Sequence, residues 1–402
     1  MSFLGVPLPD PAKARLDAGV PELALADLPE TRGLEPGRPL RLIDRTAGLA
    51  ALGVADPENG VVRIFARHEV RAGFDLAFFT RRVTASLALR QAAGLGLAPG
   101  ECFRLLNAEG DDLPGFAVDV YGAYAVVSAP SRGLLPFARL LGQATLAVGE
   151  AAPLALRGVV VKVRSKDPQD RSGKEEILGE APAAKLVVHE LGVPFEVHLQ
   201  GALNVGLFTD MREQRRGLGR FVAGKRVLNT FAYTGALSVA AARAGAATVT
   251  SVDLSSGVLS WAKENFRLSG LDPADPRYRF EVADVRRYMK RVRDDGERFD
   301  TIILDPPTVS AARASQWSMK KDYPDLIALA ARLLGPAGGI LWVSSNTRKG
   351  AGVLEHVSDG LRRAGRRGSV LEVASLPPDY PTPPAWPDAR YLEICQVFVP
   401  GE

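Results

Sequence analysis

The hydrophobic pattern of the C-terminal half predicts strands that alternate with helices. From about Val205, short apolar runs are each followed by a segment in which apolar residues recur at helical spacing. Strands are expected at 226–231, 248–253, 279–282, 301–305 and 339–344, and helices near 237–244, 256–268, 284–294 and 322–335. Such alternation is typical of βαβ units, so this part is expected to be α/β, with a doubly wound, mostly parallel sheet.

The N-terminal half has a different pattern. Residues 1–36 are rich in proline and have no clear period, so an irregular lead-in is expected. Strands at 40–44, 48–53 and 61–67 predict a small β unit, with too little apolar material for an enzyme core. An amphipathic helix near 76–93 opens an α+β unit, whose other predicted elements are strands at 103–107, 116–121, 123–128 and 157–164, a helix at 134–148 and a loop at 166–174. We therefore expect three domains, at residues 1–70, 71–200 and 201–402.

Composition narrows the class of protein. The chain has 402 residues, of which 46% are hydrophobic and 24% charged, as in soluble globular proteins. No run approaches the roughly 18 apolar residues of a membrane helix, and no basic region followed by an apolar run opens the sequence, so neither a transmembrane segment nor a secretory signal is expected. Two cysteines are too few for a zinc site or a disulfide framework. A cytoplasmic protein without a bound metal is expected.

Polar residues gather where the predicted parallel strands end, which is where doubly wound sheets bind ligands. The first strand leads into a turn with one glycine, Gly235, and the second ends at Asp253, whose carboxylate could bind a ribose diol. The Gly-x-Gly-x-x-Gly pattern that suits a pyrophosphate is absent, so S-adenosylmethionine fits this turn better than NAD. Asp284 could contact an exocyclic amine, and Asp305 opens a stiff Asp-Pro-Pro loop. Each acid could instead cap a helix or a turn.

Several segments together resemble one family. They are Gly-Leu-Phe-Thr-Asp-Met-Arg-Glu-Gln-Arg at 206–215, Val-Leu-Asn-Thr-Phe-Ala-Tyr-Thr-Gly at 227–235, Val-Asp-Leu-Ser at 252–255, Leu-Asp-Pro-Pro-Thr-Val-Ser at 304–310, and Asn-Ala-Glu-Gly-Asp-Asp-Leu-Pro-Gly-Phe-Ala-Val-Asp-Val-Tyr at 107–121. With them the chain resembles the bacterial class I S-adenosylmethionine-dependent methyltransferases of large-subunit ribosomal RNA, whose catalytic domain is Rossmann-like. Two branches are similar: cytosine-C5 enzymes, with a PUA-like N-terminal domain and a central α+β domain, and the guanine-N7 module. The resemblance implies that residues 1–70 are PUA-like.

The resemblance also implies roles for individual residues. Phe208, Asp210 and Arg212 would close over the methyl donor, a turn would cradle it, and acids would bind its ribose and lie near its adenine. The implied cofactor-binding residues are Phe208, Asp210, Arg212, Asn229, Phe231, Tyr233, Thr234, Gly235, Asp253, Leu254, Asp284, Val285 and Asp305. The implied catalytic residues, around the target base, are Asp305, Pro306, Pro307, Thr308, Ser344 and Asn346. The last two could instead cap the end of a strand.

The chain departs from the cytosine branch at a catalytic position. Cytosine C5 becomes nucleophilic only after a cysteine thiolate adds to C6, and in that branch the cysteine commonly follows strand five. This chain has Val-Ser-Ser-Asn there, at 343–346, and Cys395 is interpreted as a core residue. Guanine N7 has a free lone pair and needs only in-line placement against the methyl group. Direct displacement of the guanine-N7 type is therefore favoured. A cytosine-C5 enzyme, a methyltransferase of a protein or small molecule, and a non-catalytic RNA-binding protein remain alternatives.

Basic residues near the strand ends suggest a path for RNA, although each run alone could be a solvated helix face. The runs are Arg212, Arg215, Arg216, Arg220, Lys225 and Arg226; Arg286, Arg287, Lys290, Arg291 and Arg293; and Lys320, Lys321, Arg348 and Lys349. On the helix near 76–93, Arg81, Arg82 and Arg90 could likewise face phosphate or solvent. The expected partner is 23S ribosomal RNA or a ribosomal assembly intermediate, and a homodimer is compatible with the sequence. Asp379-Tyr380-Pro381, where the cytosine branch often has Asp-His-Pro, either borders the target pocket or is a stiff connector.

Overall fold

The computed structural model describes residues 2–31, 33–67, 73–95, 97–151, 153–164, 175–201, 204–307, 319–346 and 352–401. The chain forms two compact units, and we describe each by itself. The first contains residues 1–192, 197–205 and 378–389, and the second contains 193–196, 206–377 and 390–402. The division into three domains at 1–70, 71–200 and 201–402 stays a prediction.

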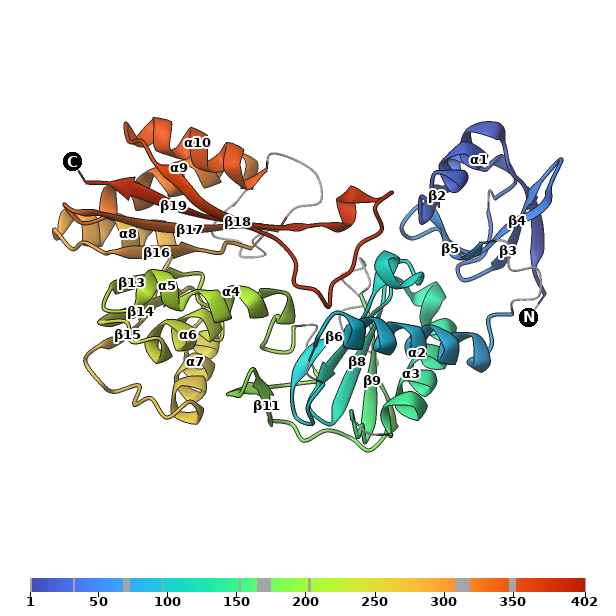
Figure 1. The fold of residues 1–402 in the computed structure, drawn as a ribbon, viewed down its shortest axis with the longest axis horizontal. Helices are drawn as coiled ribbons and strands as arrows, with labels where there is room; N and C mark the ends of the chain where they lie inside the picture. Colours follow the sequence, from blue (N-terminus) through green and yellow to red (C-terminus); the bar gives the residue numbers. More distant parts are fainter. Residues whose placement is uncertain are drawn as a thin grey trace. The chain divides into compact units, whose positions relative to one another are not determined.

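The first unit begins with a five-stranded sheet in the order β1-β3-β4-β5-β2 (Figure 1). Its elements are β1 (Leu4–Pro7), α1 (Asp10–Asp17), β2 (Glu22–Ala24), η1 (Leu25–Asp27), η2 (Pro29–Thr31), β3 (Pro39–Asp44), β4 (Gly48–Asp56) and β5 (Val61–Arg67). The expectation of an irregular lead-in was therefore wrong. Strand β1 has only four residues and pairs in parallel with the distant β3, which no local period reveals. The prolines around Asp10 occupy the start of α1, where proline is tolerated.

A second five-stranded sheet, in the order β10-β9-β8-β7-β6, packs with two helices in the same unit. The elements are α2 (Leu76–Ala92), β6 (Cys102–Asn107), η3 (Ala108–Asp111), β7 (Ala117–Tyr121), β8 (Tyr124–Ala129), η4 (Arg132–Leu134), α3 (Leu135–Gly149), β9 (Gly158–Val163) and β10 (Glu176–Gly179). Two further strands, β11 (Leu186–Glu190) and β12 (Val193–Val197), form a separate two-stranded sheet, and residues 193–196 of β12 are assigned to the second unit. Phe65 of β5 packs edge-on against Phe74, Phe116 and Phe137, so the two sheets share one hydrophobic core. The loop predicted at 166–174 lies outside the described residues.

The side chain of Arg90 on α2 lies inside the first unit and does not face a surface where it could contact phosphate. Its side chain is fully buried and forms a bidentate ion pair with Asp111, in which Nη2 lies 2.8 Å from Oδ2. The same nitrogen donates to the carbonyl of Asp379 at 2.8 Å. A buried guanidinium needs this full set of acceptors, since an unpaired buried charge is costly. The phosphate-facing and the solvated interpretations of Arg90 were both wrong.

Residues 378–389 lie between the last two strands of the chain, yet they belong to the first unit. The carboxylate of Asp379 accepts a 2.8 Å bond from the backbone nitrogen of Arg104, whose guanidinium stacks 4.5 Å above the ring of Tyr380. The carbonyl of Pro381 accepts a 2.9 Å bond from the side chain of Asn107. All three residues are occupied by contacts inside the first unit, which favours the connector interpretation of Asp379-Tyr380-Pro381.

The second unit is built on a seven-stranded sheet in the order β15-β14-β13-β16-β17-β19-β18. Its strands are β13 (Arg226–Thr230), β14 (Thr248–Asp253), β15 (Tyr278–Val282), β16 (Thr301–Leu304), β17 (Gly338–Asn346), β18 (Ser369–Ala374) and β19 (Leu392–Pro400). The strands β13 to β17 pair in parallel, and β19 is antiparallel to both neighbours. The predicted α/β, Rossmann-like, doubly wound sheet is confirmed.

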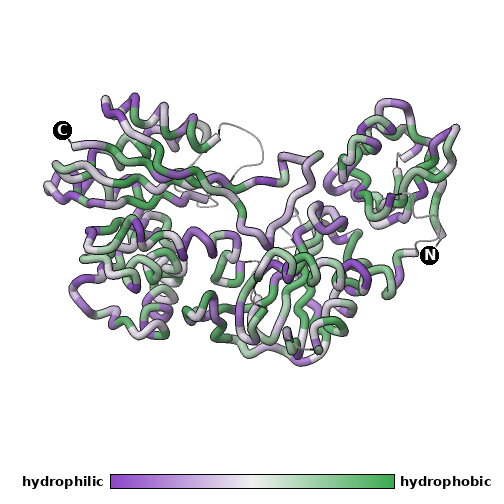
Figure 2. The backbone as a smooth tube through the Cα atoms, viewed as in Figure 1, coloured by the Kyte–Doolittle hydropathy of each residue, from purple (hydrophilic) through white to green (hydrophobic). Residues whose placement is uncertain are grey.

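Helices cover both faces of this sheet. They are η6 (Thr209–Met211), α4 (Arg212–Gly217), α5 (Gly219–Val222), α6 (Ala236–Arg243), α7 (Ser256–Leu268), α8 (Val285–Asp294), α9 (Met319–Leu333) and α10 (Val353–Ala364). The short helix η7 (Pro387–Ala389) belongs to the first unit. Helices α8, α9 and α10 cover one face and α4 to α7 the other (Figure 1). The inner strands β13, β14, β16 and β17 are buried along most of their length, as expected for a parallel sheet covered on both faces. Hydrophobic stretches are visible in this part of the chain in Figure 2.

No helix in the described ranges has both the length and the hydropathy that crossing a bilayer requires. Among the same residues, no group of three or more His, Cys, Asp and Glu side chains is arranged to hold a metal ion.

Candidate functional site

The turn after β13 and the acid at the end of β14 form one structure. The backbone nitrogen of Tyr233 donates a 3.0 Å hydrogen bond to Oδ2 of Asp253, and the backbone nitrogen of Ser255 donates a 3.0 Å bond to Oδ1. A carboxylate offers about four lone-pair sites, so Asp253 can still accept hydrogen bonds from a ligand. Because the turn itself fixes the carboxylate, a ribose diol would meet an acceptor pair that is already oriented.

The same turn is held from behind by buried polar contacts. The hydroxyl of Thr234 donates to the carbonyl of Gly206 at 2.5 Å, and Asn265 of α7 donates to the carbonyl of Thr234 at 2.8 Å. A Cβ on Gly206 would overlap the indole of Trp261, so only glycine fits there. Burial raises the pKa of Tyr233 to about 12, so its hydroxyl stays neutral and able to donate a hydrogen bond. These contacts join 206–208 to the turn 231–235.

Gly235 meets two requirements that exclude other residues. It begins α6 with φ at +76°, a left-handed conformation that side chains disfavour. A Cβ at this position would lie 2.8 Å from Cβ of Ala262 on α7. The glycine therefore allows α6 and α7 to pack closely beneath the ligand face. Phe231 and Tyr233 also have positive φ, of 53° and 48°, which is uncommon for bulky residues and frequent where a ligand is held.

Asn229 is placed differently from the other predicted cofactor ligands. Its side chain is 99% buried, and its amide nitrogen donates to the hydroxyl of Ser238 at 2.8 Å. The hydroxyls of Ser238 and Ser251 lie 2.7 Å apart, which extends this polar chain into the interior of the unit. Asn229 thus supports the turn from inside, and a direct contact with a cofactor stays a prediction.

Exposed apolar side chains surround Asp253. Leu254, the next residue, is 54% exposed. Val282 on β15, which is the register partner of Asp253, is 58% exposed. Phe208 is 47% exposed, and its ring centroid lies 5.4 Å from that of Tyr233. Large apolar residues at the open end of a sheet suit a flat ring such as adenine. An oriented carboxylate beside them fits the ribose and base of S-adenosylmethionine. Val282 was missed by sequence reasoning, because its exposure depends on where β15 ends.

Asp284 caps a helix, which was the alternative to contact with a cofactor that the sequence left open. Its carboxylate accepts a 3.0 Å hydrogen bond from the backbone nitrogen of Arg287 and so caps α8. It is half-buried, and one oxygen carries this bond, so the cap does not exclude a ligand contact. Val285 is 4% exposed and packs in the core beneath.

The carboxylate of Asp305 lies at the end of β16, beside the end of β17. The hydroxyl of Ser344 donates a short hydrogen bond to its Oδ1. Burial raises the pKa of Asp305 to about 6; the Ser344 bond opposes the shift, and the nearby carboxylate of Asp210 adds to it. Near neutral pH this carboxyl can therefore accept or exchange a proton at the site. Such a perturbed acid at the open end of the sheet is typical of an active site.

Tyr323 of α9 fixes the same two strand ends and was not foreseen from the sequence. Its hydroxyl lies 3.0 Å from the carbonyl oxygen of Leu304 and 2.6 Å from that of Ser344, and its side chain is fully buried. Only the folded structure brings this helical tyrosine below Asp305. Of the loop that follows, Pro306 is buried and Pro307 exposed, while Thr308 lies outside the described residues. Asn346, at the end of β17, is exposed.

Asp210 and its neighbours lie on the same unit. The hydroxyl of Tyr391 donates a 2.9 Å hydrogen bond to Oδ2 of Asp210. Arg215 donates to the carbonyl of Phe208 at 2.7 Å and opposes the raised pKa of Asp305. Arg212 is 5% exposed and lies 3.5 Å from the carboxylate of Glu213. Arg212 and Arg215 therefore hold the 206–215 segment in place.

Neither cysteine is available as a nucleophile. Cys395 on β19 is fully buried, and burial raises the pKa of its thiol to about 11. Its register partner is Val343, the residue before Ser344 on β17. Cys102 on β6 is 2% exposed. The interpretation of Cys395 as a core residue is confirmed, and a thiolate at the strand ends is missing.

Most of the arginines proposed for an RNA path have acidic partners. Ion pairs hold Arg216, Arg220, Arg226, Arg286, Arg291 and Arg293. On α8, Arg287 and Lys290 are exposed and make no ion pair within the described residues. Arg348 and Lys349 lie outside those residues, as does the side chain of Lys320. Lys225 and Lys321 are likewise exposed and make no ion pair within the described ranges, so available positive charge lies on α8 at Arg287 and Lys290 and at these two lysines.

Comparison with known proteins gives consistent results. The family model for S-adenosylmethionine-dependent methyltransferases matches residues 127–388. A ribosomal RNA large subunit methyltransferase I of Aeromonas salmonicida is 32% identical over 322 residues, which cover 79% of this chain and 80% of the relative. The protein of the same name from Klebsiella pneumoniae is 31% identical over 369 residues, 90% of each chain.

Solved structures agree over nearly the whole chain. A protein assigned as a methyltransferase and crystallised as a complex with SAH superposes with a TM-score of 0.85 at 25% identity, covering 99% of this chain and 100% of the other. A Streptococcus mutans structure shares the fold with a TM-score of 0.84 at 24% identity, over the same fractions. The chain belongs to the family of S-adenosylmethionine-dependent methyltransferases, and S-adenosylmethionine is its cofactor.

Proposed function

We propose that this enzyme transfers a methyl group from S-adenosylmethionine to a base of large-subunit ribosomal RNA, by direct displacement at guanine N7. The substrate class rests on one observation: relatives above 30% identity, matched over 80% or more of their length, are named ribosomal RNA large subunit methyltransferases. The reaction type rests on another, the burial of both cysteines.

Each part of the site has a role in this proposal. Asp253 binds the ribose hydroxyls, and the exposed side chains of Leu254 and Val282 cover the adenine. Phe208 and the turn 231–235 hold the methyl donor against the open end of the sheet. The Asp305-Pro306-Pro307 loop, with Ser344, faces the target base. The exposed Arg287 and Lys290 contact the RNA backbone.

Direct displacement asks little of the protein beyond placement. Guanine N7 carries a lone pair in the plane of the base, so the catalytic requirement is an in-line approach to the methyl carbon. An extruded base would be read by polar groups at the strand ends. Asp305 is suited to that task, because its carboxylate accepts hydrogen bonds from the amino and imino groups of guanine. The partner is 23S ribosomal RNA or an assembly intermediate, in the cytoplasm.

Nucleoside mass spectrometry tests the proposal directly. Unmodified large-subunit ribosomal RNA is incubated with the protein and isotope-labelled S-adenosylmethionine, digested and analysed. Labelled 7-methylguanosine is expected. Labelled 5-methylcytidine would contradict the reaction type, and labelled protein or small molecule without labelled RNA would contradict the substrate class.

A matched pair of variants ties the result to the site. Asp305→Asn removes the carboxylate at the strand end and is expected to lower the transfer rate at least tenfold. Asp325→Asn removes an exposed carboxylate from α9 in the same unit, whose ion pair within the described residues is with Arg363, and is expected to leave the rate unchanged. Cofactor binding with no transfer to any substrate by the wild type would favour a binding-only protein.

A further inference from the structure

The segment 107–121 has an unexplained polar residue. Its other polar side chains are engaged: Asn107 with Pro381, Asp111 with Arg90, Asp112 with Arg82 and Asp119 with Arg104. Glu109 forms no hydrogen bond or ion pair with any described residue, although only 6% of its surface is exposed. Within the described residues the protein supplies no hydrogen-bond donor to this carboxylate, whose oxygens remain open to solvent or to a ligand.

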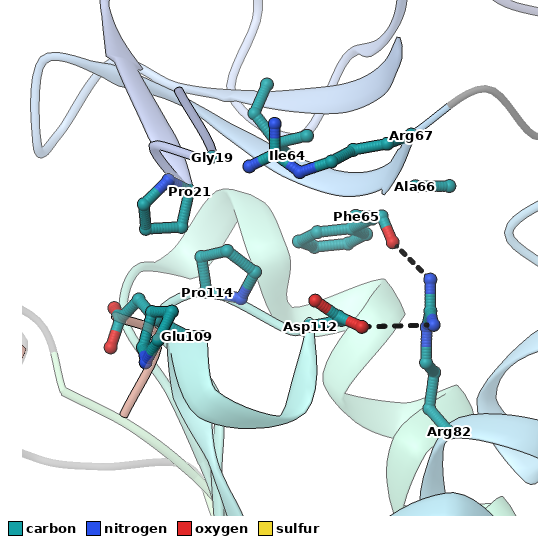
Figure 3. Close-up of a pocket in the computed structure, with 11 residues that line it drawn as sticks. Gly19, Pro21, Ile64, Phe65, Ala66, Arg67, Arg82, Glu109, Asp112 and Pro114 are labelled. Carbon is teal, nitrogen blue, oxygen red and sulfur yellow. Dashed lines mark hydrogen bonds and ion pairs between the residues drawn. The ribbon is translucent and has the colours of Figure 1, made fainter. Parts of the chain in front are cut away.

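Glu109 lines a cavity of about 210 Å³ in the first unit (Figure 3). Three prolines from separate segments, Pro21, Pro114 and Pro383, also line it and provide rigid apolar surfaces. The volume lies below the roughly 300 Å³ at which sites for drug-sized ligands begin. A single planar ring system with donor groups is therefore a better occupant than a whole nucleotide or a peptide segment.

The terminal nitrogens of the two arginines that line the cavity are already engaged. Arg67 donates to the carbonyls of Leu16 and Val20, both at 2.8 Å. Arg82 donates to the carbonyl of Phe65 at 2.7 Å and lies 3.5 Å from the carboxylate of Asp112 (Figure 3). Neither reaches Glu109. The two acceptor oxygens of Glu109 are thus left for a ligand that presents hydrogen-bond donors.

We propose that this cavity binds an unpaired guanine of the RNA substrate, with Glu109 accepting hydrogen bonds from its N1–H and its 2-amino group. Guanine is the base whose Watson–Crick edge presents two adjacent donors, which match the two oxygens of a carboxylate. Adenine and cytosine pair a single donor group with an adjacent acceptor, and uracil has one donor between two carbonyls. Single-stranded RNA is commonly read in this way, with unstacked bases hydrogen-bonded on that edge. The inference rests on the proposed RNA substrate and concerns a reading site in the first unit, separate from the target site.

Binding of short oligonucleotides to the full chain tests the proposal without methyl transfer. The probes are pentanucleotides with a central guanine, inosine or adenine between uracils, because inosine lacks only the 2-amino group. The wild type is expected to bind the guanine probe about tenfold more tightly than the adenine probe, with inosine between them. Glu109→Gln is expected to reduce the three affinities to within about twofold of one another, since an amide offers one acceptor and one donor.

Two controls separate this site from other effects. Glu150→Gln removes an exposed carboxylate at the end of α3 and corrects for the change in net charge. Asp305→Asn removes the carboxylate that faces guanine in the proposed target site, and so measures the part of the guanine preference that arises there. Glu109→Gln should also unfold at about the same temperature as the wild type, because the side chain makes no hydrogen bond or ion pair with any described residue that the change could break.

The possible outcomes are distinct. RNA binding without a guanine preference in the wild type, or with the same preference in Glu109→Gln, would overturn the reading site and leave the proposed function intact. A preference that disappears in Asp305→Asn and persists in Glu109→Gln would assign it to the target site. Absence of binding to all three probes, together with absence of methyl transfer to RNA, would overturn both proposals.

Discussion

The backbone nitrogen of Tyr233 donates a 3.0 Å hydrogen bond to the carboxylate of Asp253, although 20 residues separate them in the sequence. The bond joins the turn after β13 to the end of β14, where the parallel sheet opens. A second bond from Ser255 holds the other oxygen, so the carboxylate is oriented before any ligand arrives. Preorganised acceptors of this kind lower the cost of ordering on binding.

Asp253→Asn should weaken cofactor binding. The amide keeps one acceptor for the backbone but loses the charge that strengthens hydrogen bonds to a diol. We expect the dissociation constant of S-adenosylhomocysteine to rise roughly 10- to 100-fold, as expected for weakened hydrogen bonds to a charged group. Isothermal titration calorimetry measures it, with Asp294→Asn, a 66% exposed side chain on α8, as the control. Unchanged affinity in Asp253→Asn would remove this residue from the cofactor site.

Asp305 should make the protein less stable as the pH rises. Its pKa in the folded chain is about 6, against roughly 3.9 when unfolded, so between these values the folded state binds more protons. The free energy of unfolding therefore falls from about pH 4 to pH 6, by about 2 to 3 kcal/mol, and the loss is complete above pH 6. Asp305→Asn lacks this titration, so its stability relative to the wild type should increase over the same interval.

Urea denaturation at several pH values measures this difference. Asp300→Asn gives a control of opposite sign, because the hydrogen bond from Arg226 lowers the pKa of Asp300. The stability that Asp300 contributes is present above its unfolded pKa and is lost as the pH falls, so this variant should be least stable relative to the wild type near neutrality. Parallel pH profiles for Asp305→Asn and the wild type would contradict the raised pKa.

Gly235→Ala should destabilise the second unit through two separable effects. The left-handed φ costs about 1 kcal/mol, and the overlap with Ala262 on α7 adds about 1 to 3 kcal/mol. Gly245→Ala is the matched control, because Gly245 has φ at +83° and a Cβ at that position would have no atom within 4 Å. Chemical denaturation of both variants isolates the overlap as their difference. Equal losses of unfolding free energy in the two variants would show that α7 accommodates the added methyl group without destabilising the unit.

The sequence predicted the part of the fold that depends on the local spacing of apolar residues. The strands and helices between Arg226 and Asn346 follow from apolar runs and helical spacing, and the site follows because parallel strands end on one edge. Elements that depend on distant pairing were missed, as β1 shows. Tyr323 and Val282 were missed for the same reason: their roles arise from the packing of α9 and the end of β15. Arg90 was misread because charge in a sequence does not reveal burial.

Tyr323→Phe should reduce methyl transfer more than cofactor affinity. The hydroxyl holds the carbonyls of Leu304 and Ser344, the strand ends from which Asp305 projects, and its loss should cost about 1 to 3 kcal/mol of stability. Tyr288→Phe is the control, since that buried hydroxyl has no hydrogen-bond partner among the described residues and its removal should be neutral or stabilising. Single-turnover rates and calorimetry distinguish the two steps. Equal losses in rate and affinity would assign Tyr323 a purely structural role.

Replacing both cysteines should leave methyl transfer intact. Cys395 is fully buried with a thiol pKa raised to about 11, and Cys102 is 2% exposed, so neither offers a thiolate to a substrate at neutral pH. The variant Cys102→Ala with Cys395→Ala is expected to lose about 1 to 2 kcal/mol of stability from its two cores, with the transfer rate within about threefold of the wild type. RNA that contains 5-fluorocytidine provides the complementary test, because a cysteine-dependent C5 enzyme is trapped on it as a covalent complex. A wild-type complex that survives denaturation, and is lost with either cysteine, would show that the core opens and that transfer proceeds through a thiolate adduct.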